Sequence, residues 1–340
     1  MRRYTLLLFI AFLFVTGAVL GGGLLAGYAD KHPEHPERTV TVYTTVPPEQ
    51  AALLASEYER SMMVRVQFVP MAPEEIVKRV KKGEKSPDAD MVLADSRLLK
   101  KSASLGAFVP FISESTDSVS GEFKDEEGAW TGVWYDPVVF CVNSDYMRTL
   151  PRIPETWAEF SSVPGMRLGM TDFLASDAAA NLYFTLVSAY GDQEVFRLLS
   201  AFHPKVVQYV KYLSTPVRMT GMGEADASVA VQSETMRYLA AGYPLRMLYP
   251  RDGTAYLLTG VGLLRDDNPL AKDFAEWLLS DNAQLALQRE DVYLIPANPN
   301  TLAYKQLAGK NIKLFKKGET LTPEEERLLL DRWLKTVRFK

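Results

Sequence analysis

The sequence predicts an α/β fold in which mixed, mostly parallel sheets carry helices on both faces. Short β-branched segments alternate with helical segments along most of the chain, and repeated strand–helix–strand units of this length form parallel sheets. Several strand ends run directly into polar turns that open helices. The chain has 340 residues and 47% hydrophobic content, which is more than one hydrophobic core usually supports, so we expect two lobes.

The alternation is most regular in the first third of the chain. Thr39–Tyr43 is rich in β-branched residues and predicts a strand, after which Pro47 and Pro48 open a helix. Further strands are expected at Val64–Val69 and Met91–Ala94, and helices at Glu49–Ser61 and Pro73–Lys82. No internal repeat is visible.

The same pattern continues through longer elements toward the C-terminus. Strands are expected at Trp134–Asn143, Arg167–Met170, Ala227–Val231, Leu245–Leu248 and Ala255–Leu264, and helices at Ala178–Ala189, Ser233–Ala241, from Pro269, at Asp281–Gln288 and at Glu324–Lys335. Thr322 and Glu325 form a capping box for the last helix. This helix is expected to bury Leu328, Leu329 and Trp333 and to act as a clamp across the body of the fold.

The N-terminal segment has the pattern of an export signal. Arg2 and Arg3 precede an apolar run, Leu6–Leu25, and the small residues Gly27 and Ala29 follow it. We interpret residues 1–29 as a signal peptide cleaved after Ala29. The alternative is an uncleaved anchor, because the run is long enough to cross a bilayer. In either case the body is expected to be extracytoplasmic, since the arginines stay inside.

Charge and cysteine content exclude several classes of protein. The formal charge is −4, and removal of residues 1–29, which hold two arginines and no acidic residue, leaves −6. This argues against nucleic acid as a partner, but not against an anionic ligand, which responds to local dipoles. Residues 30–38 form a polar spacer, in which His32 and His35 are interpreted as part of a tether and not as metal ligands. The single cysteine, Cys141, cannot form an internal disulfide and lies in an apolar run.

Catalysis finds little support in the sequence. The chain has neither a Gly-x-Ser-x-Gly turn nor a His-Glu-x-x-His run, and His203 is the only histidine after the spacer. Asp95 and Asp172 could pair across a cleft as acid and base, which leaves a cleft-carboxylate enzyme as an alternative. We expect a protein that is not an enzyme.

The candidate site consists of polar residues where strands end and helices begin. These turns are Tyr43-Thr44-Thr45, Asp95-Ser96, Thr171-Asp172 through Ser176, and Val231-Gln232-Ser233. Ligands of open parallel sheets bind outside the carboxyl ends of strands, where helix N-termini favour negative charge. The hydroxyls are also ordinary helix caps. Tyr135 and Tyr256, in turn-rich segments beside long strands, are suited to lining a wet cleft, or are partly buried sheet residues.

Seven stretches of the chain resemble a known family in order and spacing. They are Val42-Tyr43-Thr44-Thr45-Val46-Pro47-Pro48-Glu49-Gln50, Asp88-Ala89-Asp90-Met91-Val92-Leu93-Ala94-Asp95-Ser96, Trp130-Thr131-Gly132-Val133-Trp134-Tyr135, Gly223-Glu224-Ala225-Asp226-Ala227, Asp252-Gly253-Thr254-Ala255-Tyr256, Asn268-Pro269 through Trp277-Leu278-Leu279-Ser280, and Ile295-Pro296-Ala297-Asn298-Pro299. Over roughly residues 40–300 the chain resembles type II periplasmic solute-binding proteins of ABC importers. The branch is that of the ferric-iron, putrescine/spermidine-like and phosphonate-binding components.

This resemblance implies a periplasmic-binding-protein type II fold whose two lobes are joined by two crossover strands. Lobe one would hold residues 39–132 and 260–340, and lobe two residues 133–259. A small solute would bind between the lobes. The protein would act as a monomer, would need no cofactor, and would have a membrane permease as its partner. The ligand-binding residues implied are Thr44, Thr45, Ser96, Tyr135, Asp172, Ser176, Gln232 and Tyr256.

Two departures from the family pattern bear on the solute. Iron-binding relatives generally use adjacent tyrosines, and this chain has no Tyr-Tyr pair, although the fold could bring Tyr135 and Tyr256 together. Ferric iron is therefore not favoured. The lobe-two turn usually reads Ser-Gly-Thr, whereas here Asp177 follows Ser176 and would repel an anion unless it points away. We expect a small anion or organophosphonate-like solute, and keep as an alternative function a ligand sensor that signals to a membrane two-component kinase.

Overall fold

The computed structural model describes residues 38–81, 88–175, 177–308, 312–316 and 321–339. Met1–Thr39 form one unit and Val40–Lys340 another; the fold described below is that of the second unit. The predicted signal or anchor, and all but Arg38 of the predicted spacer, lie outside the described residues. Within the described ranges, no helix is both long and apolar enough to cross a membrane.

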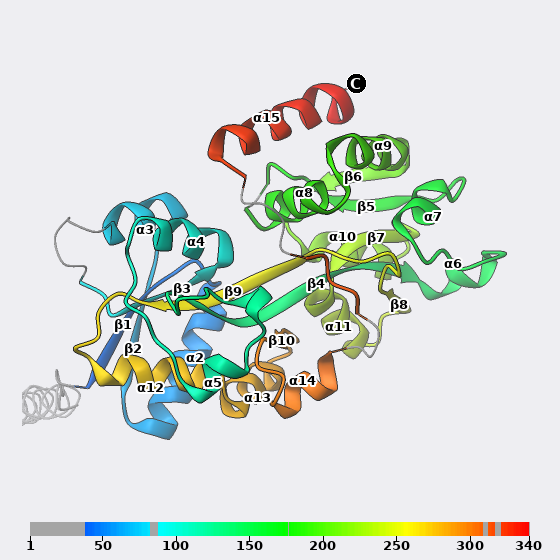
Figure 1. Ribbon diagram of the computed structural model, residues 1–340. Helices are drawn as coiled ribbons and strands as arrows, with labels where there is room; N and C mark the ends of the chain where they lie inside the picture. Colours follow the sequence, from blue (N-terminus) through cyan, green and yellow to red (C-terminus); the bar gives the residue numbers. More distant parts are fainter. Residues whose placement is uncertain (1–37, 82–87, 176, 309–311, 317–320, 340) are drawn as a thin grey trace, which may run out of the picture. The chain divides into compact units, whose positions relative to one another are not determined.

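Ten strands in the described part of the chain form one mixed sheet (Figure 1). They are β1 (Thr39–Thr44), β2 (Arg65–Pro70), β3 (Met91–Asp95), β4 (Thr131–Asn143), β5 (Leu168–Thr171), β6 (Val206–Val210), β7 (Ala227–Val231), β8 (Leu245–Leu248), β9 (Tyr256–Leu263) and β10 (Ile295–Pro296). The order is β2-β1-β3-β9-β4-β7-β5-β6, and β8 and β10 both pair with β4. Strand β1 pairs in parallel with β3, and β5 pairs in parallel with β6 on one side and β7 on the other. It is antiparallel at the centre, around β4 and β9, so the sheet has more antiparallel pairing than the sequence predicted.

Strand β4 changes partners halfway along its length. Its first part, as far as Pro137, pairs with β9, and from Val138 onward it pairs with β7 and β8. Pro137, which has no N–H to donate, stands at this change of partner. All 13 residues of β4 are buried, which agrees with the long strand that the sequence predicted here. The resulting strand is shared by the two ends of the sheet.

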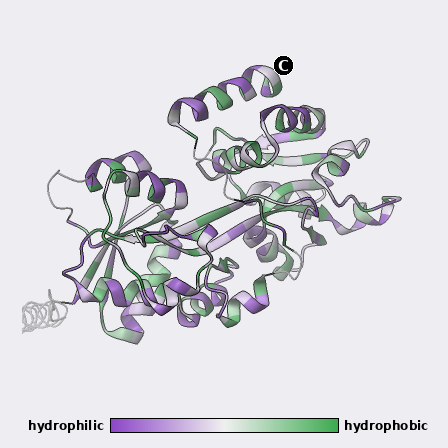
Figure 2. Ribbon diagram, in the orientation of Figure 1, coloured by the Kyte–Doolittle hydropathy of each residue, from purple (hydrophilic) through white to green (hydrophobic). Residues whose placement is uncertain are grey.

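Fourteen α-helices flank the sheet in the described residues. They are α2 (Pro48–Met62), α3 (Pro73–Val80), α4 (Ser96–Ser104), α5 (Glu114–Ser118), α6 (Ser144–Thr149), α7 (Trp157–Ser162), α8 (Asp177–Tyr190), α9 (Asp192–Phe202), α10 (Ser214–Gly221), α11 (Gln232–Ala240), α12 (Pro269–Leu278), α13 (Asp281–Arg289), α14 (Leu302–Leu307) and α15 (Pro323–Trp333). Short 3-10 turns lie at Gly121–Phe123 and His203–Lys205, and a π-helical turn, Leu334–Arg338, continues α15. Figure 2 shows hydrophilic and hydrophobic residues on the same helices, as expected for helices that cover a sheet.

Two large groups of apolar side chains lie on either side of this partner change. The first core includes Tyr58, Trp134 and Phe274 and draws on β1–β3, the first half of β4, β9, α12 and α13. The second core includes Phe140 and Trp157 and draws on the second half of β4, β5, β7, α8 and α9. Since β4 contributes to both cores, it ties them together covalently.

The C-terminal helix packs on the second core. Trp333 and Val337 are buried there, although the sequence grouped residues 260–340 with lobe one. The chain reaches this core after a backbone pairing at Thr254, whose N–H donates to the Lys313 carbonyl at 2.8 Å and whose carbonyl accepts from Phe315 N–H at 2.9 Å. Tertiary packing of one apolar face therefore decides where this helix lies.

Candidate functional site

An aromatic cluster lies where β4 and β9 run side by side. The ring centroids of Tyr135 and Tyr256 are 6.2 Å apart in an edge-on arrangement, and Phe123 lies 4.9 Å from the first ring and 5.4 Å from the second. Tyr135 pairs with Leu258 on β9 and Tyr256 with Pro137 on β4. The two tyrosines that the sequence singled out are thus brought together next to the partner change of β4.

The tyrosine hydroxyls of this region stay protonated at neutral pH. Burial raises the pKa of Tyr256 to about 12, and burial together with the hydroxyl of Tyr304 raises the pKa of Tyr135. Burial likewise raises the pKa of Tyr249, and the carboxylate of Asp136 adds to the effect. A protonated phenol both donates and accepts hydrogen bonds, so this cluster is suited to a polar organic ligand.

Gln232 is held inside the protein by its own hydrogen bonds. Its side chain is fully buried, its Nε2 donates to the Leu307 carbonyl at 3.1 Å, and its Oε1 accepts from the Tyr249 hydroxyl at 2.5 Å. The sequence predicted Gln232 as a ligand-binding residue. In the structure these two hydrogen bonds hold Tyr249 and connect α11 with α14, and the ligand-binding role stays a prediction.

A carboxylate from β4 caps helix α11. Asp136 accepts the Ser233 N–H at 2.9 Å on Oδ1 and the Ser233 hydroxyl at 2.5 Å on Oδ2. Burial outweighs these bonds and raises the pKa of Asp136 to about 7. This contact ties the residue next to Tyr135 to the first turn of a helix that packs against the other half of β4.

The neighbouring threonines at the end of β1 differ in accessibility. Thr44 is fully buried, its hydroxyl donates to the Leu93 carbonyl at 2.7 Å, and its Oγ1 accepts from Val46 N–H at 3.0 Å. Thr45 is half-buried. Thr44 therefore supports the turn between β1 and α2, and Thr45 is the more accessible of the two. The sequence predicted a binding role for both, and that role stays a prediction.

Ser96 is the first residue of α4 and lies in the predicted position after β3. Asp95 accepts from the N–H groups of Arg97 and Leu98 and so caps the helix. No hydrogen bond joins the Ser96 hydroxyl to another described residue, and the side chain is buried, with 7% of its surface exposed. The adjacent carboxylate fills the other donors of this helix start, which lowers the attraction of this end for an anion.

Asp172 also has a protein partner. Its Oδ1 accepts from Leu174 N–H at 3.0 Å, and its Oδ2 is 3.2 Å from Nε of Arg338, which follows α15. Asp95 and Asp172 are therefore engaged in separate structural contacts and not with each other. Ser176 lies outside the described residues, as does the side chain of Asp177.

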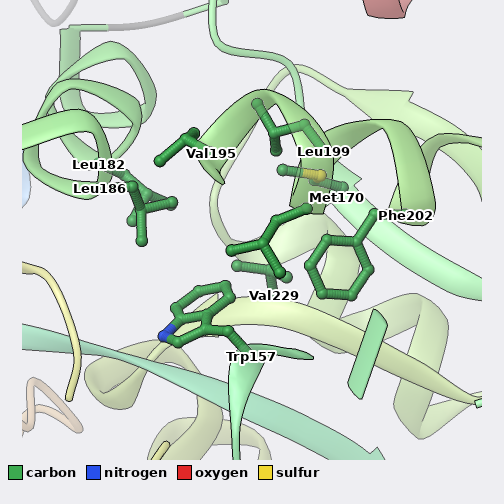
Figure 3. Close-up of a pocket in the computed structure, with 9 residues that line it drawn as sticks. Trp157, Met170, Leu182, Leu186, Val195, Leu199, Phe202 and Val229 are labelled. Carbon is green, nitrogen blue, oxygen red and sulfur yellow. The ribbon is translucent and has the colours of Figure 1, made fainter. Parts of the chain in front are cut away.

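An apolar cavity lies inside the second core (Figure 3), and its lining includes none of the residues of the aromatic cluster. It is lined by Trp157, Met170, Leu182, Leu186, Val195, Leu198, Leu199, Phe202 and Val229. The one polar group of the lining, the Trp157 indole N–H, donates to the Gly253 carbonyl at 3.0 Å. This cavity offers no free polar group to fix the orientation of a ligand, so it is not included in the candidate site.

Sequence reasoning missed several residues of the cluster. Tyr249 directly follows β8, so the strand-end rule that selected other residues would have found it. Phe123 ends a short 3-10 turn shortly before β4, and Tyr304 lies far from β4 in sequence; neither follows a predicted strand, so neither carries a strand-end signal. Within the described ranges no group of three or more His, Cys, Asp or Glu is placed to hold a metal ion.

Comparison with known proteins identifies the class. The family model of bacterial extracellular solute-binding proteins matches residues 40–290, and the chain belongs to this family. Over 334 residues it is 25% identical to an uncharacterized protein of Haemophilus influenzae, which covers 93% of this chain and 95% of that protein. Over 156 residues it is 26% identical to the probable ABC transporter periplasmic-binding protein y4fP of Sinorhizobium fredii, with 45% of this chain and 40% of that protein covered.

Solved structures give the same fold. The periplasmic binding protein AfuA from Actinobacillus pleuropneumoniae, solved with fructose-6-phosphate bound, matches with a TM-score of 0.70 at 19% identity, covering 89% of this chain and 99% of that chain. The fold is the two-lobed fold of periplasmic binding proteins that the sequence predicted. The protein is a solute-binding component of an ABC import system, and proteins of this kind work with a membrane permease.

Proposed function

We propose that this protein captures a small organic phosphate or phosphonate by closing its two lobes about the region where β4 and β9 run together. The observation that carries the proposal is that β4 serves both hydrophobic cores, with the aromatic cluster at its change of partner. Two strands that link two separately packed bodies are suited to act as a hinge. A solute that contacts both bodies would shift the population toward the closed form.

The proposed solute class rests on the groups left available at the strand ends. Thr45 is half-buried, Ser96 has a hydroxyl that no described residue uses, and Tyr256 presents a protonated phenol. We expect these hydroxyls to bind the charged group, because Asp95 and Asp136 already occupy the first N–H groups of α4 and α11. The similarity to AfuA, solved with a sugar phosphate, supports the same class.

The remaining features of the proposal concern location and partners. Residues 1–29 would export the chain and be removed, the protein would act as a monomer, and the closed form would dock on the permease. Binding, and not turnover, would be its activity, in keeping with the structural contacts made by Asp95 and Asp172. Sequencing of the mature N-terminus distinguishes a cleaved signal from an anchor.

The solute class is tested by titration calorimetry on the purified protein. The probes are fructose 6-phosphate, 2-aminoethylphosphonate, inorganic phosphate and ferric citrate, with fructose as the uncharged control. We expect a phosphorylated or phosphonate probe to bind, fructose not to bind, and X-ray scattering to show compaction with the bound probe. Binding of ferric citrate alone, or binding without compaction, would contradict the proposal.

The neighbouring threonines provide a matched pair of variants. Thr45→Val is expected to weaken binding of the best probe about tenfold, because one hydrogen bond to a charged group is lost. Thr44→Val is expected to leave affinity unchanged and to lower the free energy of unfolding by about 1–2 kcal/mol, because it leaves a buried carbonyl and a buried N–H without a partner. Calorimetry and urea unfolding measure the two effects, and equal loss of affinity in both variants would argue against a contact from Thr45.

A further inference from the structure

Arg97 joins helix α4 to two elements of the second core. Its guanidinium is 2.6 Å from the Glu326 carboxylate on α15 and lies over the Phe184 ring of α8 at 5.0 Å from the centroid. Helix α4 itself buries Leu98 and Leu99 in the first core. We propose that Arg97 and Glu326 form a latch between the two lobes, which holds them in the arrangement seen here before any solute binds.

The far side of the latch is firmly anchored. Trp333 of α15 is fully buried, with its ring centroid 5.0 Å from that of Phe173. The Leu329 carbonyl accepts a hydrogen bond from the Tyr183 hydroxyl at 3.1 Å. Arg338 pairs with Asp172. Because these contacts fix α15 to the second core, a contact made by Glu326 restrains the position of the whole second lobe.

The first turn of α15 holds three glutamates, and the carboxylate of one of them pairs with a residue outside its own helix. Glu325 completes the capping box with Thr322, and Glu324 pairs with Arg327. Glu326 instead reaches Arg97, a residue of another element. This division of roles among three consecutive glutamates points to a contact between bodies, and not to an incidental pair on one helix face.

The latch bears on binding because Arg97 directly follows Ser96. The contacts of Arg97 with α8 and α15 therefore set the position of the Ser96 hydroxyl relative to the second lobe. The effect of this position on solute binding rests on the proposed function. The two side chains are 30% and 23% exposed, so water screens the pair only in part. A half-screened ion pair together with a cation–π contact would favour the latched arrangement about tenfold.

The test measures the distance between the lobes in the solute-free protein. Nitroxide labels are placed at Ser104→Cys on α4 and Gln193→Cys on α9, both exposed positions, while the natural Cys141 is fully buried. Double electron–electron resonance spectroscopy then gives the distribution of distances between the two labels. We expect Glu326→Gln, which removes the ion pair and keeps the cation–π contact, to raise the ratio of separated to latched molecules about three- to fivefold. We expect 1 M NaCl to shift the wild-type protein in the same direction.

Matched variants separate the latch from general effects on the helix. Glu324→Gln removes a charge from the same first turn of α15, two residues before Glu326. It is expected to leave the distance distribution unchanged. Arg97→Glu combined with Glu326→Arg is expected to restore much of the latched population. An unchanged distribution in both Glu326→Gln and 1 M NaCl would overturn the latch, as would an equal shift in Glu324→Gln.

The same labels distinguish failure of the latch from failure of the clamp. If fructose 6-phosphate or 2-aminoethylphosphonate binds and changes the distance while Glu326→Gln does not, the clamp stands and the latch is wrong. If Glu326→Gln changes the distance while every bound probe leaves it unchanged, the latch stands and the clamp is wrong.

Discussion

At the scale of single residues, Asp136 is the most unusual ionisable group near the candidate site. Its side chain is buried beside Tyr135, and it accepts two hydrogen bonds from Ser233. Burial is the largest influence on its pKa, and the nearby Glu234 raises it further. The residue therefore supports a helix cap at the cost of placing a carboxylate in an apolar surrounding, where ionisation is disfavoured.

The pKa of Asp136 gives stability a defined pH dependence. The group titrates near 4 in the unfolded chain and at about 7 in the folded protein, so the folded state binds the proton more tightly. Its contribution to stability is present in full below about pH 4 and is lost as the pH rises through about 7. Asp136→Asn does not titrate and keeps an acceptor for Ser233 N–H. Between pH 5 and 8 the variant is expected to gain about 2 kcal/mol relative to wild type.

Urea unfolding at pH 5, 6, 7 and 8 measures this difference. Asp273→Asn, at an exposed position of α12, is the control and is expected to follow the wild-type curve. A constant difference between Asp136→Asn and wild type across this range would show that the carboxyl group is ionised throughout.

At the scale of elements, the two crossover strands approach one another through a pair of glycines. Gly132 on β4 is the register partner of Gly260 on β9, and the register shifts just after Gly132. A Cβ on Gly260 would lie 2.6 Å from the Thr131 carbonyl oxygen, and one on Gly132 would lie 2.7 Å from the Phe123 carbonyl oxygen. Both contacts are with backbone atoms that cannot rotate away. Gly260 therefore lets β9 pass close to β4, and Gly132 lets the turn that ends at Phe123 pass close to β4.

Gly260→Ala is expected to lower the free energy of unfolding by about 2 kcal/mol, because β4 and β9 must separate to admit the methyl group. Gly121→Ala is the control, since a Cβ there meets no atom within 4 Å. Its effect is expected to stay within about 0.5 kcal/mol. Denaturant unfolding of the two variants checks the prediction, which fails if they are equally stable.

At the scale of the whole molecule, the C-terminal helix completes the second core. Trp333 lies against Phe173 and Tyr209, which belong to segments more than a hundred residues earlier in the chain. Arg332 pairs with Asp192 and lies 4.1 Å from the centroid of the Phe196 ring. The last helix is therefore a structural part of the body and not an appendage.

Trp333→Ala is expected to destabilise the protein by about 3–5 kcal/mol, because it opens a large cavity in the second core. Leu328→Ala, on the same helix but half exposed, is expected to cost less than about 0.5 kcal/mol. Thermal and urea unfolding test both variants. A small loss in Trp333→Ala would mean that α15 is not firmly packed in solution.

The sequence by itself determined most of the elements and part of the site. Hydrophobic periodicity, proline positions and capping residues act within a few residues, so α2, β3, β4 and β9 were predicted to within a few positions. The meeting of Tyr135 and Tyr256 was foreseen as something the fold could produce, and the structure confirms it. The roles of the other predicted ligand residues stay predictions, because no bound solute tests them.

Only the tertiary structure decided which polar groups are free and which are used. Thr44 and Thr45 are indistinguishable in sequence, but the close pairing of β1 with β3 buries one hydroxyl against the Leu93 carbonyl and leaves the other accessible. Gln232, Asp136 and Asp172 likewise have partners 75, 97 and 166 residues away. A local pattern states what a side chain can do, whereas contacts between distant segments determine which of its hydrogen bonds remain for a ligand.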